Sequence, residues 1–325
     1  MARPSGEWCG RSGEAWERLG TAVRGEARPG EAKSGRNGNA LLGGARNDRV
    51  WSGVAGPARL SVAEQDTARH GEARPAVRGW PDLRLAFTDI HPNSPIGKVF
   101  MEDRETQPAV LMGFPYADTW KKHRARFKVR SWALDSGAVT AANSGEPIDL
   151  AGYTAFARDM KASDPTLEDV FALDMMGDWR ASLRNAEWMW KHGVEAIPCW
   201  HAGEPEAVLV GLARDYPKIA VGGSWKMRGP ARIRLVEQIF ARIWPKRIHG
   251  FGMSEEALLM KFPFHSVDAS SWQLGPMKFR QFKGLGKANL RVPCKTIDLR
   301  GEVDHYLAIE ARARAQWARL IPEKP

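Results

Sequence analysis

The sequence predicts an α/β fold in which a closed (β/α)₈ barrel follows a disordered N-terminal segment. From about residue 82, short apolar runs alternate with amphipathic runs, which is typical of βα units around a parallel sheet. About seven such units can be counted, and residues 81–325 match the roughly 250 residues of a typical (β/α)₈ TIM barrel. A doubly wound open sheet is the alternative. No G-x-G-x-x-G motif follows the first strands, so the barrel is favoured.

Periodicity and helix-ending residues place the individual elements. The expected strands cover residues 109–116, 131–137, 170–175, 195–201, 218–223, 247–252 and 264–272. The expected helices cover residues 148–161, 179–193, 204–216, 231–244 and 254–262. We expect Asp149 to cap the first of these helices and Gly193 to end the second.

Residues 1–80 differ in composition from the rest of the chain. They hold 14 of the 32 glycines and twelve arginines against one lysine, with no sustained period. Such a segment cannot bury enough apolar surface to offset the entropy of ordering it, so we predict that it is disordered. Residues 81–325 then form the barrel domain with a basic C-terminal extension. Two alternatives concern residues 1–80: an Arg/Gly-rich arm that binds nucleic acid, and a wrongly assigned start, with translation beginning near Met101.

Composition also excludes several classes of protein. No run of 18 or more apolar residues occurs, so no membrane-spanning helix is expected. No charged start followed by an apolar stretch is present, so no secretory signal is predicted. Cys9, Cys199 and Cys294 lie far apart in the sequence, which indicates neither a disulfide framework nor metal-ligand spacing. We therefore expect no metal and a reducing, cytoplasmic setting.

The basic excess of the chain lies at its two ends. Residues 1–80 carry net charge +4, residues 81–274 are neutral, and residues 275–325 carry +6. This distribution permits a polyanionic partner. The candidate nucleic-acid contacts are Lys121, Lys122, Arg124 and Arg126, in WKKHRARFKVRSW (120–132), and Lys278, Arg280 and Lys283. Phosphate neutralisation with aromatic stacking would suit a polynucleotide, whereas an exposed basic helix that binds nothing is the alternative.

Carboxylates, histidines and glycines end the expected strands, where the active site of a parallel barrel lies. The residues at these ends are Asp135, Ser136, Gly137, Asp174, Gly177, Asp178, His201, Gly222, Gly223, His249, Gly250 and Asp268. A single Asp at a strand end is ordinarily a structural residue satisfied by loop N–H groups, but three at one rim favour a site. Paired carboxylates suit double displacement at a sugar carbon, because one attacks while the other handles the proton of the leaving group. This reasoning predicts retaining glycosyl chemistry and specifies neither sugar nor aglycone.

Six segments in the same order resemble motifs of a known family. They are LDSGAVTAANSG (134–145), FALDMMGDW (171–179), IPCWHAGE (197–204), IAVGG (219–223), HGFGMS (249–254) and SVDASSW (266–272). Together they resemble the tRNA-guanine transglycosylase superfamily, and most strongly its phage and bacterial branch associated with 7-deazaguanine in DNA. The resemblance covers about residues 109–272.

The resemblance implies a role for each matching residue. Asp268 would be the nucleophile that attacks C1′ of a guanosine nucleotide, and Asp135 the general acid/base. Asp174 would read the Watson–Crick edge of the purine beside Ser136. The backbone N–H groups of Gly222 and Gly223 would contact the base carbonyl, and His201 stands where the tRNA enzymes have a glutamine. Further candidates for base binding are Asp178, His249 and Gly250, and Trp179 and Trp272 are candidates for stacking on the base.

Two departures from the tRNA enzymes bear on the substrate. Their C-x-C-x-x-C zinc motif with its distant His is absent after Asp268, and VDASSW replaces their nucleophile motif. Both favour DNA as the acceptor, with a free 7-deazaguanine base as co-substrate and no cofactor. A queuine-type enzyme acting on tRNA is the alternative within enzymes, and a non-catalytic nucleic-acid-binding barrel is the alternative outside them. A homodimer is left open.

Overall fold

The computed structural model describes residues 82–88, 90, 97–227, 229–279, 282–283 and 299–318. The predictions for residues 1–80, Cys9, Cys294 and Arg280 therefore lie outside the described residues. Among the helices that the structure does describe, none is both long and apolar enough to cross a membrane.

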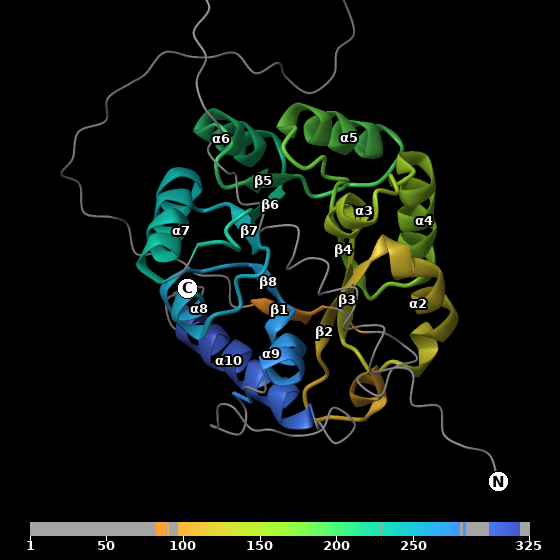
Figure 1. Cartoon of the computed structure of the whole chain (residues 1–325), viewed down its shortest axis with the longest axis vertical. Helices are drawn as coiled ribbons and strands as arrows, with labels where there is room; N and C mark the ends of the chain where they lie inside the picture. Colours follow the sequence, from red (N-terminus) through yellow and green to blue (C-terminus); the bar gives the residue numbers. More distant parts are fainter. Residues whose placement is uncertain are drawn as a thin grey trace, which may run out of the picture. The chain divides into compact units, whose positions relative to one another are not determined.

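A closed parallel barrel forms the centre of the described chain (Figure 1). The eight strands that the structure describes run in the order β4-β3-β2-β1-β8-β7-β6-β5. Their bounds are β1 (Arg84–Phe87), β2 (Ala109–Gly113), β3 (Ser131–Asp135), β4 (Leu167–Val170), β5 (Cys199–His201), β6 (Lys218–Gly222), β7 (Arg247–Gly250) and β8 (Ser266–Ala269). A parallel bridge between Phe171 and Ile197 joins the two ends of this order, so the sheet closes on itself as the sequence predicts.

Helices surround the strands (Figure 1). Their bounds are α2 (Ala117–His123), α3 (Ala138–Ser144), α4 (Leu150–Ser163), α5 (Trp179–Lys191), α6 (Glu206–Asp215), α7 (Gly229–Ile243), α8 (Glu256–Lys261), α9 (Ser271–Phe279) and α10 (Arg300–Ala318), with short 3₁₀ turns η1 (Gly97–Met101), η2 (Phe114–Tyr116) and η3 (Arg124–Arg126). The Asp149 carboxylate accepts from the first-turn N–H groups of α4, and α5 ends at Lys191, two residues before the left-handed Gly193. Both end signals predicted from the sequence are therefore present.

Three expectations about the elements are corrected by the structure. A strand was expected at residues 170–175, but β4 covers Leu167–Val170. It contains two adjacent acidic residues, which are more typical of a loop than of a strand. The run 264–272 contains β8 and then the start of α9. β1 was not among the strands expected from the sequence; it pairs with both β2 and β8 and precedes Met101. A chain starting at Met101 would lack this strand.

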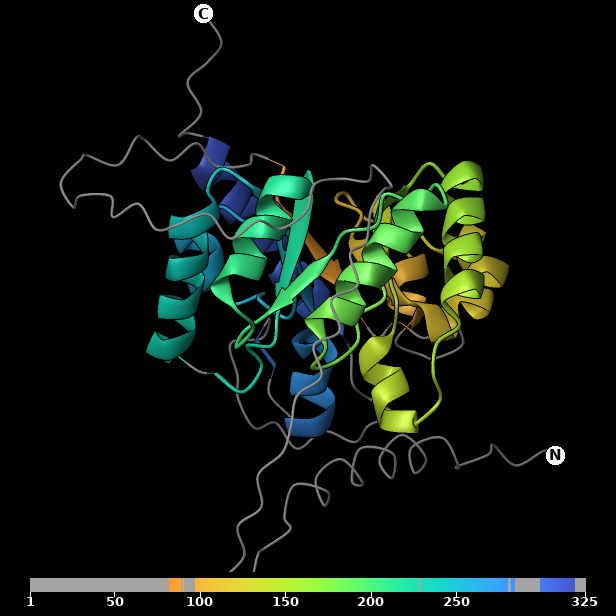
Figure 2. The same ribbon diagram turned by 90° about the horizontal axis from the view of Figure 1, so that it is seen from above.

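Alternation along the strands decides which side chains face the barrel axis. One buried cluster, which includes Ala86, Ala109 and Ala220, fills the interior, whereas a larger cluster that includes Leu85 and Ile219 lies under the helices. The small residues fill the middle of the interior, and the polar side chains that face inward lie toward the two ends of the barrel. Two short helices, α3 and α9, follow β3 and β8 and project from the same end of the barrel (Figure 2).

Candidate active site at the carboxyl ends of the strands

Asp268 lies at the inward-facing third position of β8 and is buried. Its Oδ1 accepts a hydrogen bond from the backbone N–H of Gly252, with 2.6 Å between the two heavy atoms. His249 Nε2 lies 3.6 Å from the same oxygen, while His249 Nδ1 is 2.9 Å from Ser266 Oγ. Burial lowers the pKa of His249, so this imidazole is neutral beside the carboxylate at neutral pH.

Asp135 ends β3 on the inward row, and its Oδ2 accepts from the Gly137 N–H at 2.9 Å. Burial raises the pKa of Asp135 to about 6, the Gly137 hydrogen bond opposes this shift, and the negative charge of Asp268 adds to it. The two carboxylates therefore lie near enough to influence each other, although β2 and β1 separate their strands in the sheet. Asp135 can hold or release a proton near neutral pH.

Asp174 lies four residues beyond β4, at the same end of the barrel. Burial raises its pKa to about 7; His201 opposes the shift, and the charges of Asp135 and Glu204 add to it. Its Oδ2 is 3.4 Å from His201 Nε2, whereas its Oδ1 is buried and has no hydrogen-bond partner. A buried carboxylate oxygen without a partner is costly in a folded chain, which indicates a position where a ligand is to be bound.

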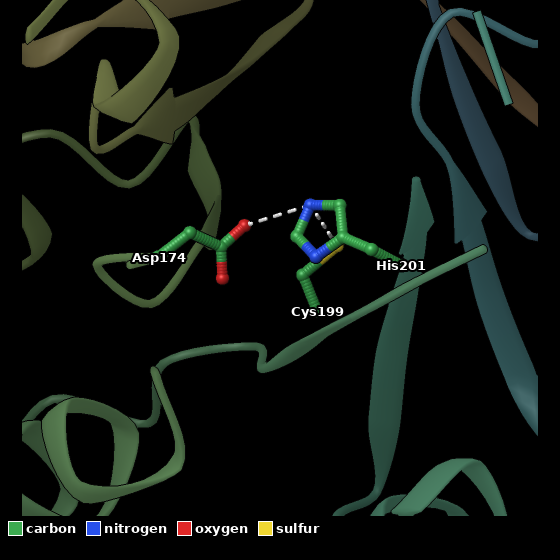
Figure 3. Close-up of side chains that lie close together, drawn as sticks. All are labelled: Asp174, Cys199 and His201. Atoms are coloured by element: carbon green, nitrogen blue, oxygen red, sulfur yellow. Dashed lines mark hydrogen bonds and ion pairs between the residues drawn. The ribbon is translucent and has the colours of Figure 1, made fainter. Parts of the chain in front are cut away.

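His201 connects Asp174 to two residues that the sequence analysis did not assign. Its Nδ1 lies 3.4 Å from Glu204 Oε1, and its backbone N–H donates to Glu204 Oε2 at 3.1 Å. Cys199 Sγ lies 3.7 Å from His201 Nε2, so Asp174, Cys199 and His201 point toward one another (Figure 3). Burial opposes protonation of His201, but the Glu204 hydrogen bond and the acidic charges raise its pKa. Because alternate residues of a strand share a face, the spacing C-x-H on β5 could have revealed this pair.

The three predicted glycines have different reasons for lacking a side chain. A Cβ at Gly222 would lie 3.1 Å from His201 Cδ2, so glycine leaves room for the imidazole. Gly223 has a φ of +74°, and its Cβ would lie 2.9 Å from a backbone nitrogen. A Cβ at Gly250 would instead meet Phe264 at 2.8 Å, because this position faces the outer core. Gly222 and Gly223 thus border the site, while the missing side chain of Gly250 serves packing.

Three more predicted site residues have clear structural positions. Ser136 is buried directly after Asp135. Asp178 is exposed and caps α5 by accepting from the Ala181 N–H at 3.0 Å. Trp272 is fully buried, and its indole N–H donates to the Thr88 carbonyl at 3.0 Å. The expectation that Trp272 stacks on a base is therefore wrong, because the ring is already packed inside the protein.

The basic segment after β2 lies away from the carboxylates. Arg124 donates to Asp164 at 2.9 Å and to Thr166 at 2.7 Å, and both partners immediately precede β4. The segment is thus at the amino-terminal end of the strands, because helices of a barrel return the chain to that end. Its aromatic residues are buried, with Trp120 packed between Phe127 and Trp132, so the expected stacking there is wrong. Of the four candidate nucleic-acid contacts in this segment, Lys121, Lys122 and Arg126 are exposed.

The second basic group follows Asp268 in sequence. Lys283 donates to the Tyr306 hydroxyl at 3.1 Å and lies over its ring, so it packs on α10. Lys278 is at the last turn of α9. These contacts of Lys283 are thus with α10 and not with the inward-facing carboxylates.

A cavity of about 460 Å³ opens at the opposite end of the barrel and does not coincide with the carboxylates. Its lining consists of Asp82, Arg84, Arg130, Glu168, Asp169, Lys218, Arg247, His265 and Arg314. Asp169 is held there by Lys218 and Arg84 at 2.5 and 3.2 Å. Active sites of such barrels lie at the carboxyl-terminal face, whereas ion pairs at the amino-terminal face stabilise the fold. The candidate active site is therefore at the carboxylates and not in this cavity.

No family model matches the chain, and no curated protein matches it. Solved structures with a similar arrangement include a chain of the tryptophan synthase complex from the hyperthermophile Pyrococcus furiosus, which is 13% identical with a TM-score of 0.42 over 72% of this chain and 98% of that one. The carboxyl transferase domain of Rhizobium etli pyruvate carboxylase is 11% identical with a TM-score of 0.37, over 76% of this chain and 50% of that one. Both likenesses are too distant to inform the site, whose interpretation rests on its own geometry.

Proposed function

We propose that this chain is a nucleic-acid guanine transglycosylase, a retaining pentosyltransferase that exchanges guanine for a 7-deazaguanine base in DNA. The observation that carries the proposal is that Asp135, Asp174 and Asp268 surround one mouth of a closed barrel. Each carboxylate has a different environment, and such differences separate the roles of acid, base and nucleophile. The resemblance of the six sequence motifs supplies the identity of the base.

In the first step Asp268 attacks C1′ of the target nucleotide. The bond from C1′ to guanine N9 breaks, its electron pair leaves with the base, and Asp135 supplies a proton to the leaving guanine. The sugar is then held as an ester of Asp268. The hydrogen bond from Gly252 fixes the Oδ1 atom of this carboxylate, which restricts the direction of attack.

In the second step the incoming base takes the place of guanine. Asp135, now ionised, accepts the N9 proton of a 7-deazaguanine, and N9 attacks C1′ while the bond to Asp268 breaks. Two inversions at one carbon give net retention. The raised pKa of Asp135 supports this double use, because the same group must be protonated in one step and ionised in the next.

Asp174 and Gly222 are the residues we assign to the base. The unpartnered Asp174 Oδ1 would accept from the ring N–H or the exocyclic amine of guanine, and the backbone beside Gly222 would approach the base carbonyl closely. A guanine inside a duplex cannot reach such a mouth, so the nucleotide must be flipped out or be single-stranded.

The proposal is tested by base exchange. Single-stranded DNA, duplex DNA and tRNA, each carrying radiolabelled guanine, are incubated with the protein and with the 7-cyano form of 7-deazaguanine, and released guanine is measured. We expect release from DNA by the unaltered protein and none by the Asp268→Asn variant. Asp159→Asn is the matched control, because Asp159 is exposed on α4 and far from the mouth.

Release of guanine from tRNA alone would mean that the nucleic-acid substrate is tRNA and not DNA. Binding of nucleic acid without release from any substrate would contradict it. Full activity of the Asp268→Asn variant would show that the nucleophile is another residue.

A further inference from the structure

We propose that Asp174, Cys199 and His201 form a zinc-binding site at the carboxyl end of the barrel. Among the described residues these three offer a carboxylate oxygen, a thiol sulfur and an imidazole nitrogen within 4.8 Å of one another. The site uses none of the cysteine spacing found in the zinc motif of the tRNA enzymes. It also does not depend on the proposed base exchange.

The two separations that involve His201 match those of a tetrahedral zinc ion, and the Cys199 sulfur and an Asp174 carboxylate oxygen lie within 4.8 Å of each other. Zinc bonds of about 2.3 Å to sulfur and about 2.0–2.1 Å to nitrogen or oxygen, at tetrahedral angles, place sulfur and nitrogen roughly 3.6 Å apart and nitrogen and oxygen roughly 3.4 Å apart. The Cys199 Sγ to His201 Nε2 distance is 3.7 Å, and the His201 Nε2 to Asp174 Oδ2 distance is 3.4 Å. Binding of all three atoms to one ion therefore needs adjustment only between the Cys199 sulfur and the Asp174 carboxylate.

Glu204 orients the His201 imidazole, as carboxylates commonly do when they hydrogen-bond to a metal-binding histidine. Its Oε1 lies 3.4 Å from His201 Nδ1, and its Oε2 accepts from the His201 backbone N–H. A carboxylate on Nδ1 favours the tautomer whose Nε2 lone pair is free for a metal. Nε2 is the ring nitrogen that lies near both Cys199 Sγ and Asp174 Oδ2, and Figure 3 shows the imidazole between these two side chains.

Charge and space also suit a divalent ion. One thiolate and one carboxylate neutralise Zn²⁺, so the filled site would carry no net charge in a barrel interior where isolated charges are costly. A Cβ at Gly222 would lie 3.3 Å from His201 Nε2 and 3.5 Å from Cys199 Sγ, so glycine keeps the space beside both donors clear. Three protein ligands leave a fourth position open, as in catalytic rather than structural zinc sites.

The metal and the base would share Asp174. If both proposals hold, we expect zinc to inhibit base exchange, because the same carboxylate cannot serve the ion and the purine equally well. Metal binding is measured without any nucleic acid or free base, so a negative result in one experiment leaves the other result intact.

The test is titration of the metal-free full-length protein with Co²⁺, followed by competition with Zn²⁺. We expect one Co²⁺ per chain, visible absorption bands of a tetrahedral ion, and a near-ultraviolet band from thiolate to cobalt charge transfer. Cys199→Ser should abolish the charge-transfer band, and His201→Ala should weaken Co²⁺ binding at least tenfold. Cys294→Ser is the matched control and should retain the full spectrum. Thermal unfolding of each variant verifies that it folds.

Three results would overturn the site. They are less than about 0.1 Co²⁺ per chain at millimolar metal, a charge-transfer band that survives Cys199→Ser, and a band lost equally in Cys294→Ser. If Cys199→Ser fails to fold, the Asp174→Asn variant replaces it. That variant should keep the charge-transfer band of the remaining thiolate while losing affinity.

Discussion

The Asp268 carboxylate accepts a hydrogen bond from the backbone N–H of Gly252, with 2.6 Å between Oδ1 and the nitrogen. Gly252 follows β7, whereas Asp268 belongs to β8, so the loop of one strand fixes the side chain of the next. An amide donor is permanent and carries no charge that titrates. The hydrogen bond fixes the orientation of the Asp268 carboxylate, which suits a nucleophile.

We expect Asp268→Asn to lose the covalent intermediate while keeping the fold. The asparagine carbonyl can still accept from the Gly252 N–H. The free energy of unfolding should therefore change by about 1 kcal/mol or less, which corresponds to a few degrees in the unfolding temperature. Denaturing electrophoresis with radiolabelled DNA should show a protein–DNA adduct for the unaltered chain only. An adduct formed equally by the variant would assign the attack to another residue.

The pH dependence of guanine release should report Asp135. Its pKa is raised to about 6 by burial, opposed by the Gly137 hydrogen bond and increased by the charge of Asp268. Because the protonated form donates to the leaving base, kcat/KM for release should fall as pH rises through about 6. Asp135→Asn should lower kcat/KM by about 10²–10⁴-fold and remove this limb of the profile. A variant profile that keeps the limb would exclude Asp135 as its source.

The same substitution should make the protein more stable at high pH. The folded-state pKa of Asp135 exceeds that of the unfolded chain, so the folded state binds more protons between pH 3.8 and about 6 and loses stability as pH rises through this window. Asp135→Asn avoids that loss. Urea unfolding should show a gain of about 1–3 kcal/mol at pH 8 and almost none at pH 4. A loss of stability at pH 8 would contradict the sign.

At the other end of the barrel, Asp169 should behave in the opposite way. Burial alone would raise its pKa, but Lys218 and Arg84 lower it to about 2. The stability that this pairing provides is present above the unfolded-state value near 4 and is lost as pH falls toward 2. Asp169→Asn should cost about 3–5 kcal/mol at pH 7, because it leaves buried Lys218 without its partner.

The surface pair of Arg214 and Asp215 provides the control for that experiment, since both residues are exposed. Asp215→Asn should cost no more than about 1 kcal/mol at pH 7. Equal losses for the two variants would mean that the buried network does not differ from an ordinary surface ion pair.

Local pattern predicted much of this fold because strand and helix periods are properties of short segments. The alternation of apolar and amphipathic runs predicted a parallel barrel, and the cap at Asp149 and the stop at Gly193 are present. The same alternation predicted Asp135 at the end of its strand and Asp268 within the strand 264–272; Asp135 ends β3, and Asp268 is the third of the four residues of β8. β1 was missed because four residues give too weak a period, and β4 was misplaced because Glu168 and Asp169 resemble a loop.

The sequence by itself determined which residues lie near the carboxyl ends of the strands, because the order of residues along a strand fixes its end. The period of two then assigns each side chain to one face of the strand. Only the tertiary structure decided their neighbours. Asp174, Cys199 and His201 converge because the closure of the sheet through Phe171 and Ile197 brings the loop after β4 beside β5. Arg124 lies at the opposite end of the barrel from Asp135, because α2 returns the chain to the amino-terminal end of the strands. The local sequence therefore sets the face of the strand on which a side chain lies, whereas closure of the barrel sets which side chains become its neighbours.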